Sequence, residues 1–515
     1  MENQKKTFSM RIKKEYVGVI LVIALGLAVR LYGINSPLVD SHQIRQAQTA
    51  MMTRNLYYDN MDIFHTRLDF FGEEPGHVIM EFPLMHGITA LLYYIFGPCD
   101  VIGRLVSVAF SVGAMFLMYA LARQFLPRPG SFAALALYAF SPMNIFFSRA
   151  FMPESSMMFF MIGALYFIIR WLKEETRGLY LAAVIFAAIV GLIKPTAGIV
   201  FVPILTAWFL KYRWNLFRRF TFWIYMLLAI MPLILWGAYA HHFNAMNPCP
   251  LGYGVSWMKI IRTRGIMEHW FNFKFYKFVG GSIVLILLTP LGFLGTAGGV
   301  LCVRKGNQRK LLYLWLGAII AYFYVLAGPN SGHIYYHLPL LPLSAIFFGF
   351  SVEWLLNRRS FFKKVFKKKG VKLLGLGLIS LILVGYGIGY LKYFRYMYDI
   401  TLRMPYVLEV SEIIKRNTPK ERFIVMNQGG VPPAVLAYYS ERKTSFFIVW
   451  KEAITDLENQ RARGATAYVA INSKYTNAVQ TTKNNKDFWK YLNEKYAPIA
   501  VTDNYLIFDI REEKK

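Results

Sequence analysis

The feature that most constrains this chain is a succession of long apolar segments separated by short basic ones. A helix needs about 20 mainly apolar residues to cross the ~30 Å hydrocarbon layer of a membrane, because each residue rises about 1.5 Å and lipid cannot satisfy exposed peptide groups. The first 391 residues contain eleven such segments, which we interpret as spans. They cover residues 17–34, 101–123, 131–147, 155–172, 178–193, 196–211, 220–240, 279–302, 311–327, 337–356 and 371–391.

Composition leads to the same class of protein. Among 515 residues, 56% are hydrophobic and 17% are charged, whereas soluble domains carry about 25% charged residues. The formal net charge is +29, a value that would suggest nucleic acid binding in a soluble protein. Here the basic residues cluster between apolar segments, as in cytoplasmic loops that face anionic lipid. The charge therefore indicates membrane topology and not a nucleic acid partner.

Orientation follows from the positive-inside rule. With a cytoplasmic N-terminus, every strongly basic turn falls inside: 123–128, 173–177, 211–219, 304–310 and 358–372. The short outer loops carry only Arg149 and Lys194. The apolar segment 84–96 is too short to cross and is predicted to be an interfacial helix, since a crossing there would turn the later basic loops outward. We therefore expect a multi-pass protein of the cell membrane.

The predicted organisation has two domains. Residues 1–392 form a transmembrane domain with long outer loops at 35–100 and 241–279, and residues 393–515 form a soluble extracytoplasmic domain. The tail alternates predicted strands and helices, which is typical of an α/β layer structure. The strands are expected at 422–426, 445–450, 465–471 and 499–508, and the helices at 404–416, 451–463 and 485–495. The expected fold is an α-helical polytopic membrane protein with about 11 transmembrane helices and a C-terminal soluble α/β domain.

Polar groups at a membrane surface are costly and point to function. In the first outer loop, Asp40 precedes a helical segment that carries Arg45, and it is expected either to cap that helix or to belong to a site. Arg149 and Glu154 share one short outer loop, where Glu154 begins a span and the helix dipole favours its ionised form. Because these residues lie on the same predicted side as Asp40, we favour a site over a set of helix-start residues.

A lysine and an aromatic segment add to this outer surface. Lys194 breaks an apolar run at the outer boundary, where it either snorkels to the interface or binds a phosphate. Tyr335 and Tyr336 follow, although aromatic residues are common at membrane interfaces in any case. His333 and His337 have the i, i+4 spacing of metal ligands, but no nearby glutamate completes a metal motif. Hydrogen bonding to a phosphate or sugar is the favoured interpretation of this segment.

The order of these motifs resembles glycosyltransferase family 39, a GT-C group of polytopic enzymes related to protein O-mannosyltransferases and to the bacterial aminoarabinose transferase of lipid A. The resemblance covers about residues 15–350. It rests on these segments in order: the Asp40 loop, Glu81-Phe82-Pro83-Leu84, Phe96-Gly97, Ile102-Gly103-Arg104-Leu105-Val106-Ser107, Ser141-Pro142, Arg149 with Met152-Pro153-Glu154, Lys194-Pro195 and Tyr335-Tyr336-His337-Leu338-Pro339-Leu340-Leu341-Pro342.

The resemblance implies that a sugar moves from a polyprenyl-phosphate donor to a lipid, glycan or protein acceptor on the outer side. It places an essential acidic residue at Asp40 and a second acidic position at Glu154. Asp40 is predicted to take the acceptor's proton or to stabilise an oxocarbenium-like centre. With one carboxylate acting as base and no covalent sugar intermediate required, we expect inversion at the anomeric carbon.

The leaving phosphate needs cations or hydrogen-bond donors in a partly dehydrated site. Many relatives have a Lys-Pro-Pro segment whose lysine contacts the donor phosphate, but this chain has Glu81-Phe82-Pro83. The predicted substrate-binding residues are therefore Arg45, Arg149, Lys194, Tyr335, Tyr336 and His337. No cofactor is certain. The candidate ligands for a divalent ion, which some relatives use, are His42, Glu81 and His333.

Two other classes of protein compete with a glycosyltransferase. A transporter or flippase of lipid-linked sugars usually places charged groups near the bilayer midplane and is built from repeats. We find no internal repeat, and the polar groups lie at the outer ends of the predicted spans. A scaffolding protein would leave Asp40, Glu154 and Lys194 without a role. A nucleotide-sugar donor would be cytoplasmic, where the short basic loops carry no Asp-x-Asp motif.

Overall fold

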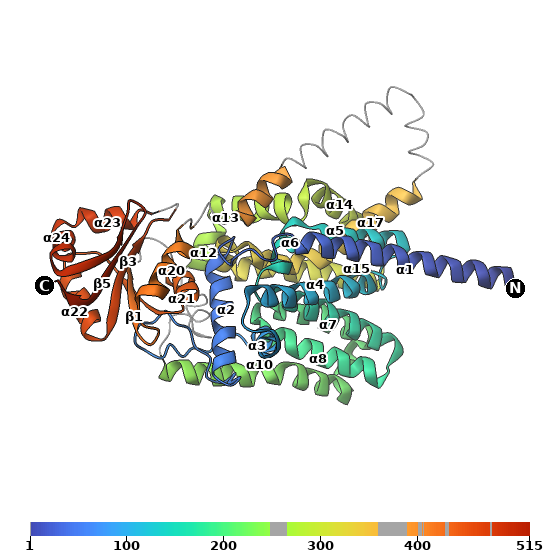
Figure 1. Ribbon diagram of the computed structural model, residues 1–515. Coiled ribbons are helices and arrows are strands. Elements are labelled where there is room, and N and C mark those ends of the chain that lie inside the picture. The colour runs from blue at the N-terminus through green and yellow to red at the C-terminus, as the bar shows by residue number, and fades with distance from the viewer. Residues whose placement is uncertain are drawn as a thin grey trace, which may run out of the picture.

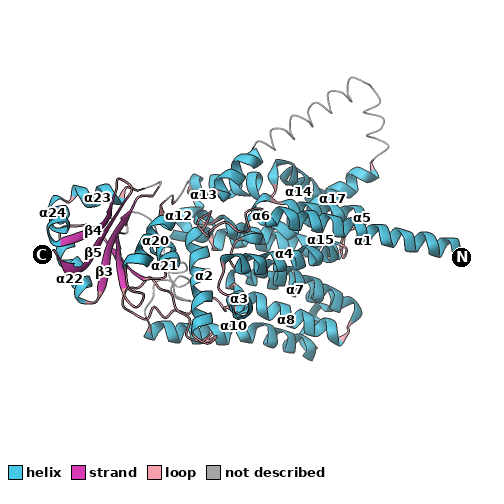
Figure 2. Ribbon diagram, viewed as in Figure 1, coloured by secondary structure: helices cyan, strands magenta, loops and turns pink. Residues whose placement is uncertain are grey.

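The computed structural model describes residues 2–247, 265–358, 389–399, 404, 406–427, 432–473 and 476–514. It consists of a long helical bundle with a sheet domain at one end (Figure 1). The N-terminus lies at the end of the bundle opposite to the sheet domain. Figure 2 shows that the described strands are confined to that C-terminal domain, apart from a single bridge between Arg67 and His77 in the first outer loop.

The bundle and its outer loops contain α-helices joined by short 3-10 or π segments. The first half has α1 (Glu2–Leu31), α2 (Gln43–Tyr58), α3 (Leu84–Phe96), α4 (Asp100–Ala122), α5 (Arg128–Phe140), α6 (Pro142–Arg149), α7 (Glu154–Glu174), α8 (Arg177–Ile193), η1 (Pro195–Val200), α9 (Phe201–Tyr212) and η2 (Arg213–Arg218). The second half has α10 (Phe220–Met246), α12 (Gly265–Trp270), α13 (Phe273–Gly281), η3 (Ser282–Leu287), α14 (Thr289–Cys302), α15 (Asn307–Val325), α16 (Ala327–Gly332), η4 (Ile334–Leu340) and α17 (Leu341–Asn357).

Several of these helices match the expected spans in length and hydropathy. Among the described residues, five are long and apolar enough to cross a membrane: Asp100–Ala122, Glu154–Glu174, Pro195–Arg218, Phe220–Met246 and Ile334–Asn357. The number rises to seven if two bent pairs are each counted as one span. The first expected span and the one at 178–193 are shorter apolar helices, Tyr16–Leu31 and Arg177–Ile193. The short segment at 84–96 is a helix with those bounds.

Two expected straight spans are bent. The helix expected at 131–147 breaks at Ser141, where α5 and α6 meet at 59° and Pro142 opens the second helix. The helix expected at 279–302 turns by 100° between η3 and α14, next to Thr289 with its positive φ of 70°. Proline cannot donate a helical hydrogen bond, which explains the first break. The expected span 371–391 lies outside the described residues except for its last three positions.

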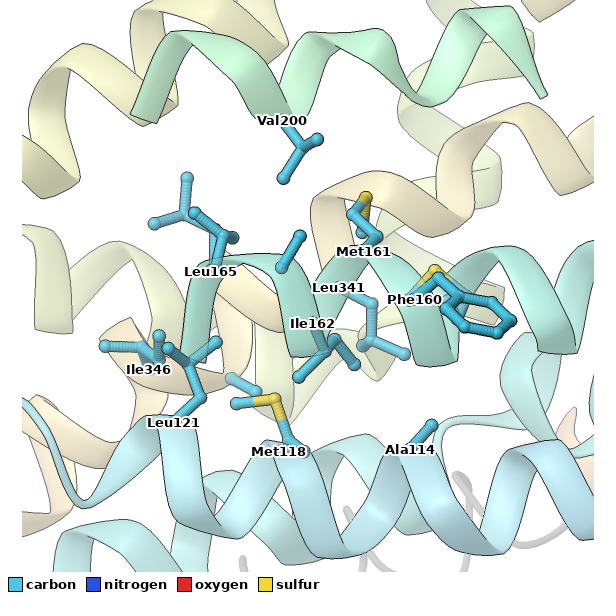
Figure 3. Close-up of a cluster of buried hydrophobic side chains, with 14 of the residues drawn as sticks. Ala114, Met118, Leu121, Phe160, Met161, Ile162, Leu165, Val200, Leu341 and Ile346 are labelled. Atoms are coloured by element: carbon cyan, nitrogen blue, oxygen red, sulfur yellow. The ribbon is translucent and has the colours of Figure 1, made fainter. Parts of the chain in front are cut away.

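The interior of the bundle is apolar and closely packed (Figure 3). Small residues bring neighbouring helices together, as is usual in membranes, where close packing replaces the hydrophobic effect as the main attraction. A Cβ atom added at Gly299 would lie 1.7 Å from the carbonyl oxygen of Phe347, and one at Gly163 would lie 2.1 Å from the ring of Phe186. Each clash pairs two different helices, so α14 and α17, like α7 and α8, depend on these glycines for their contact.

The C-terminal domain is a five-stranded mixed sheet of order β2-β1-β3-β5-β4. Its strands are β1 (Phe423–Asn427), β2 (Lys443–Phe447), β3 (Ala465–Ile471), β4 (Tyr496–Val501) and β5 (Tyr505–Glu513). Its helices are α20 (Val407–Asn417), α21 (Pro433–Ser440), α22 (Ala453–Ala462), α23 (Ala478–Asn484) and α24 (Lys486–Lys495). β1 pairs with β2 and β3 in parallel, and β5 pairs with β3 and β4 in antiparallel. The expected α/β layer domain is confirmed.

One predicted strand in this domain is wrong. The segment 499–508 is not one strand, because it contains the end of β4, a turn at 502–504 and the start of β5; in the turn, the amide of Thr502 donates to the carbonyl of Tyr505 at 3.0 Å. The β-rich composition runs through both strands, and the polar residues 502–504 make the turn. Helices α21 and α23 were also not expected, since both are short and lack a clear helical period.

The first outer loop is folded onto the sheet domain. Helix α2 runs across the end of the bundle, between it and the sheet domain (Figure 1). Val39 and Ala47 belong to the same buried apolar cluster as Ile424 of the sheet. The edge of β2 is also paired with this loop, since the amide of Thr444 donates to the carbonyl of Asp69 at 2.9 Å and its carbonyl accepts from Gly72 at 2.8 Å. The loop and the domain therefore share one interior.

Candidate functional site

Asp40 is the centre of a buried polar cluster below this junction. Its side chain is fully buried, and one oxygen, Oδ2, accepts from Nη2 of Arg104 at 3.2 Å and from Nη2 of Arg149. The other oxygen, Oδ1, accepts from Nε2 of Gln46 at 2.5 Å. Both arginines also donate to the carbonyl of Gly33, directly after α1. Charge-assisted hydrogen bonds of this kind fix geometry, so Asp40 ties the end of α1 to α4 and α6.

The structure corrects one expectation about this segment. Asp40 does not cap α2, because that helix begins at Gln43 with His42 at the N-cap position and no side-chain cap hydrogen bond. The carboxylate is taken instead by the two arginines. Arg104 belongs to the sequence motif at 102–107, but the sequence alone assigned it no role. Its positive charge near the start of an apolar span is the feature that could have identified it as a functional residue.

A buried ion pair joins α7 to the turn after α8. Nζ of Lys194 donates to Oε1 of Glu154, and the exposed fractions of the two side chains are 6% and 1%. The same ammonium lies 4.5 Å from the ring centroid of Tyr335 and 4.9 Å from that of Tyr336. The other glutamate oxygen, Oε2, is buried and has no hydrogen-bond partner among the described residues. A buried oxygen that makes no hydrogen bond is costly, which marks this atom as one that a ligand can satisfy.

A second ion pair lies nearer the surface. Nη2 of Arg45 donates to Oε2 of Glu81 at 2.7 Å, with side chains that are 17% and 24% exposed. Burial acts to raise the pKa of Glu81, but the positive charges of Arg45 and Lys194 outweigh it and hold that pKa below its usual value. Burial acts to lower the pKa of Arg45, but its interactions with Glu81, and then with Tyr335 and Glu154, raise that pKa above its usual value. The two ion pairs therefore act within one electrostatic field.

Histidines surround this group of charges. The ring of His42 lies 5.2 Å from that of Tyr335, and the ring of His333 stacks on Tyr335 at 5.2 Å. Burial and the nearby positive charges of Lys194 and Arg45 lower the pKa of His333, which favours its neutral form. The predicted metal candidates His42 and His333 lie with ring centroids 6.2 Å apart. Within the described ranges, no group of three or more His, Cys, Asp or Glu side chains is arranged to hold a metal ion.

One predicted substrate contact lies elsewhere. The ring of His337 is fully buried, and its Nε2 is 3.0 Å from the carbonyl of Asn330. It packs between the rings of Phe278 and Phe323, at 6.1 and 5.5 Å. The helical turn that directs Tyr335 and Tyr336 toward Lys194 directs His337 away from it. Its Nε2 is therefore taken by a backbone carbonyl, while its Nδ1 is buried and has no hydrogen-bond partner among the described residues.

The Asp40 cluster and the Glu154–Lys194 pair are connected. Gln46 donates to Asp40 and accepts from the amide of Phe151 at 3.2 Å, so it joins the two through the turn between α6 and α7. Arg149, which binds Asp40, is five residues before Glu154, and five residues span at most about 18 Å. Acidic and basic side chains from loops far apart in the sequence therefore lie together at one end of the bundle.

The C-terminal domain contributes contacts that sequence reasoning missed. The hydroxyls of Tyr438 and Tyr439, on α21, both donate to the carboxylate of Asp100 at the start of α4, at 2.5 and 2.8 Å. The oxygen of Tyr439 also accepts from the amide of Leu38 at 2.5 Å, two residues before Asp40. No local pattern in the sequence links these positions, which are more than 300 residues apart. We call Tyr438, Tyr439, Asp100 and Leu38 the tyrosine clamp.

Comparison with known proteins agrees with this geometry. Residues 81–236 match the family model described as dolichyl-phosphate-mannose-protein mannosyltransferase. The structure is similar to that of ArnT from Cupriavidus metallidurans in the apo state, with a TM-score of 0.65 and 15% identity over 95% of this chain and 97% of that chain. No curated protein sequence matches the chain.

Two further solved structures are similar. One is the same ArnT bound to undecaprenyl phosphate, with a TM-score of 0.61, 14% identity and coverage of 95% of this chain and 97% of that chain. The other is the archaeal oligosaccharyltransferase AglB from Archaeoglobus fulgidus in complex with an inhibitory peptide and a dolichol-phosphate, with a TM-score of 0.53, 11% identity and coverage of 95% and 74%.

The chain therefore has the fold of ArnT and is similar to AglB. Residues 81–236, in its first half, also match a mannosyltransferase family model, and its apolar helices are those of a multi-pass membrane protein. The predicted polytopic fold is confirmed, and neither comparison supports the transporter alternative.

Proposed function

We propose that this protein transfers a sugar from a polyprenyl-phosphate donor to an acceptor on the extracytoplasmic side of the cell membrane. The observation that carries the proposal is the pair of adjacent ion pairs, Arg45–Glu81 and Glu154–Lys194, at the end of the bundle beside the sheet domain. The solved structures similar to this chain include complexes with undecaprenyl phosphate and with a dolichol-phosphate. A lipid carrier keeps the donor in the bilayer, where an interfacial site can reach its phosphate.

In this proposal the cations stabilise the leaving phosphate. Arg45 is partly exposed and pairs with Glu81 through Nη2. Lys194 lies beneath it, beside the rings of Tyr335 and Tyr336. As the bond from the anomeric carbon to the phosphate oxygen breaks, negative charge grows on that oxygen, and donors placed beforehand stabilise it most in a site with little water.

Glu154 is our candidate for the base. Its Oε2 has no hydrogen-bond partner among the described residues and can accept the proton of an acceptor hydroxyl, while Oε1 stays bound to Lys194. Asp40, the base that the family resemblance suggests, has both oxygens in hydrogen bonds to Gln46, Arg104 and Arg149. This favours a positioning role for Asp40. With one base and no covalent intermediate, the sugar is transferred with inversion.

The proposed orientation places the site outside the cytoplasm. Basic turns lie together at the other end of the bundle, where Nζ of Lys173 donates to Gln124 at 2.8 Å and Lys211 pairs with Glu175. Positive turns of this kind remain cytoplasmic. Single cysteines in place of the exposed residues Lys173 and Lys451 test the orientation, because only the second is expected to react with an impermeant reagent in intact cells.

The catalytic proposal is tested with purified protein in lipid and a panel of labelled polyprenyl-phosphate monosaccharides. We expect release of polyprenyl phosphate with at least one sugar and a loss of ~10²–10³ in turnover for Arg45→Gln. The matched control is Arg170→Gln, which removes an exposed arginine–glutamate pair far from the site and should leave turnover unchanged. Turnover with nucleotide sugars alone, or equal loss in both variants, would contradict the proposal.

A further inference from the structure

A second concave surface lies on the C-terminal domain, away from the charged site. It is a groove of about 620 Å³ between the end of β2 and one face of α22. Its lining residues are Phe446, Phe447, Ile448, Trp450, Asp456, Asn459, Gln460 and Arg463. The strand β2 is at the edge of the sheet and runs parallel to β1. The groove therefore lies beyond the carboxyl end of an edge strand.

The two walls of the groove differ in chemistry. The strand side presents large apolar side chains to solvent, with Phe446 41%, Ile448 61% and Trp450 48% exposed. The helix side presents only polar groups at i, i+3, i+4 and i+7 spacing: Asp456, Asn459, Gln460 and Arg463. An aromatic face opposite a row of amide and charged groups matches one kind of ligand, a sugar ring, which has an apolar C–H face and a hydroxyl edge.

The groove is preorganised. Nε1 of Trp450 donates to Oδ2 of Asp456 at 2.6 Å, and the carbonyl of Trp450 accepts from Asn485 at 2.9 Å. Behind it, the buried ring of Phe447 packs against Phe488 at 5.6 Å. Trp450 is therefore held through its ring nitrogen and through its backbone, so a ligand that stacks on the indole costs little side-chain entropy.

The charge of the lining residues and the position of the groove limit the class of ligand further. The lining carries one carboxylate and one guanidinium, which cancel, so the groove has no preference for an anionic polymer. It is also connected to the first outer loop, since the ring of Phe446 lies 6.2 Å from that of Phe70. Glu81 is eleven residues beyond Phe70, which sets an upper limit of about 40 Å on that distance.

We propose that this groove binds a neutral oligosaccharide portion of the acceptor, distant from the hydroxyl that receives the sugar. The inference rests on the proposed function, because it names the acceptor as a glycan. Binding of a remote part of a substrate supplies energy that positions its reacting end. When the groove binds this remote portion, the end of the glycan that receives the sugar would be held toward the membrane surface.

The test is direct binding to the full-length protein in lipid nanodiscs. Neutral hexasaccharides of glucose, mannose, galactose and N-acetylglucosamine serve as probes, with saturation-transfer difference NMR as the readout. We expect at least one probe to bind in the millimolar range, and its affinity to fall about five- to tenfold in Trp450→Ala because the stacking contact is lost. Thr455→Ala, on the same helix but outside the groove, is the matched control and should bind as wild type does.

The outcomes separate this inference from the proposed function. Absence of binding by all four probes, equal binding by Trp450→Ala, or preferential binding of an apolar peptide overturns the groove proposal. Donor turnover is measured on the same samples. Oligosaccharide binding without any donor turnover overturns the proposed function alone, and donor turnover without oligosaccharide binding overturns the groove alone.

Discussion

The buried pair between Lys194 and Glu154 allows a quantitative prediction. Replacing Lys194 with methionine leaves Glu154 buried with no partner charge, and breaking a buried pair in this way costs roughly 3–5 kcal/mol. Because both side chains are almost fully buried, screening by solvent does not reduce this figure much. The lysine also loses its contacts with the rings of Tyr335 and Tyr336, each worth about 0.5–2 kcal/mol.

The double variant Lys194→Met/Glu154→Gln separates charge from packing. With both charges removed, no buried charge remains unpaired, so much of the lost stability should return. We expect a coupling free energy of about 2 kcal/mol or more from a double-mutant cycle followed by thermal unfolding in detergent. Sugar transfer should fall ~10²–10³ in all three variants, since the restored stability does not restore the cation or the base.

An exposed pair provides the control. Lys211 and Glu175 form the same type of ion pair at the opposite end of the bundle, with side chains 32% and 51% exposed. Lys211→Met should change stability little, because exposed pairs are solvated in both states. If the effects of Lys194→Met and Glu154→Gln simply add in the double variant, or if Lys194→Met is as stable as wild type, the two charges do not depend on each other and the reasoning fails.

Three further outcomes are expected. Asp40→Asn keeps the shape but loses the charge that holds Arg149, so kcat should fall while donor KM changes little, and Asp40→Glu should restore part of kcat; an unchanged kcat in Asp40→Asn contradicts this role. Tyr439→Phe breaks the clamp to Asp100 and should raise hydrogen exchange around α2 by about five- to tenfold; unchanged exchange contradicts it. The pKa of Glu81 is lowered in the folded protein, so its ion pair stabilises the fold fully above the pKa of the unfolded state, and this stabilisation is lost as the pH falls through the lowered value. The thermal unfolding midpoints of wild type and Glu81→Gln should therefore differ at neutral pH and converge in acid; midpoints that differ equally at both pH values contradict it.

Much of the helical part could be predicted because membrane spans are encoded locally. The start of α7 at Glu154 and the short helix at Leu84–Phe96 follow from apolar length alone. The bends were not predicted: Pro142 permits a break between α5 and α6, but a proline within an apolar segment does not by itself give the 59° angle between the two helices. In the tail, hydrophobic composition does not distinguish one strand from two, so the hairpin at Thr502 was missed.

The site was predictable as a set of charges but not as a set of pairs. Burial cost draws attention to Arg149, Glu154 and Lys194 wherever they lie near a membrane. Which partner each one takes is a property of the fold. Asp40 pairs with Arg104 and Arg149 instead of capping a helix. His337 contacts the carbonyl of Asn330, whereas the neighbouring tyrosines at 335 and 336 lie against Lys194.

The tyrosine clamp also constrains the order in which the fold is completed. Tyr438 and Tyr439 follow Asp100 by 338 and 339 residues, so they leave the ribosome long after Leu38 and Asp100 have done so. The first outer loop can settle into its final position only after the C-terminal domain has folded against it. Until then the amide of Leu38 lacks its tyrosine partner, and the segment that carries Asp40 is not yet fixed from that side.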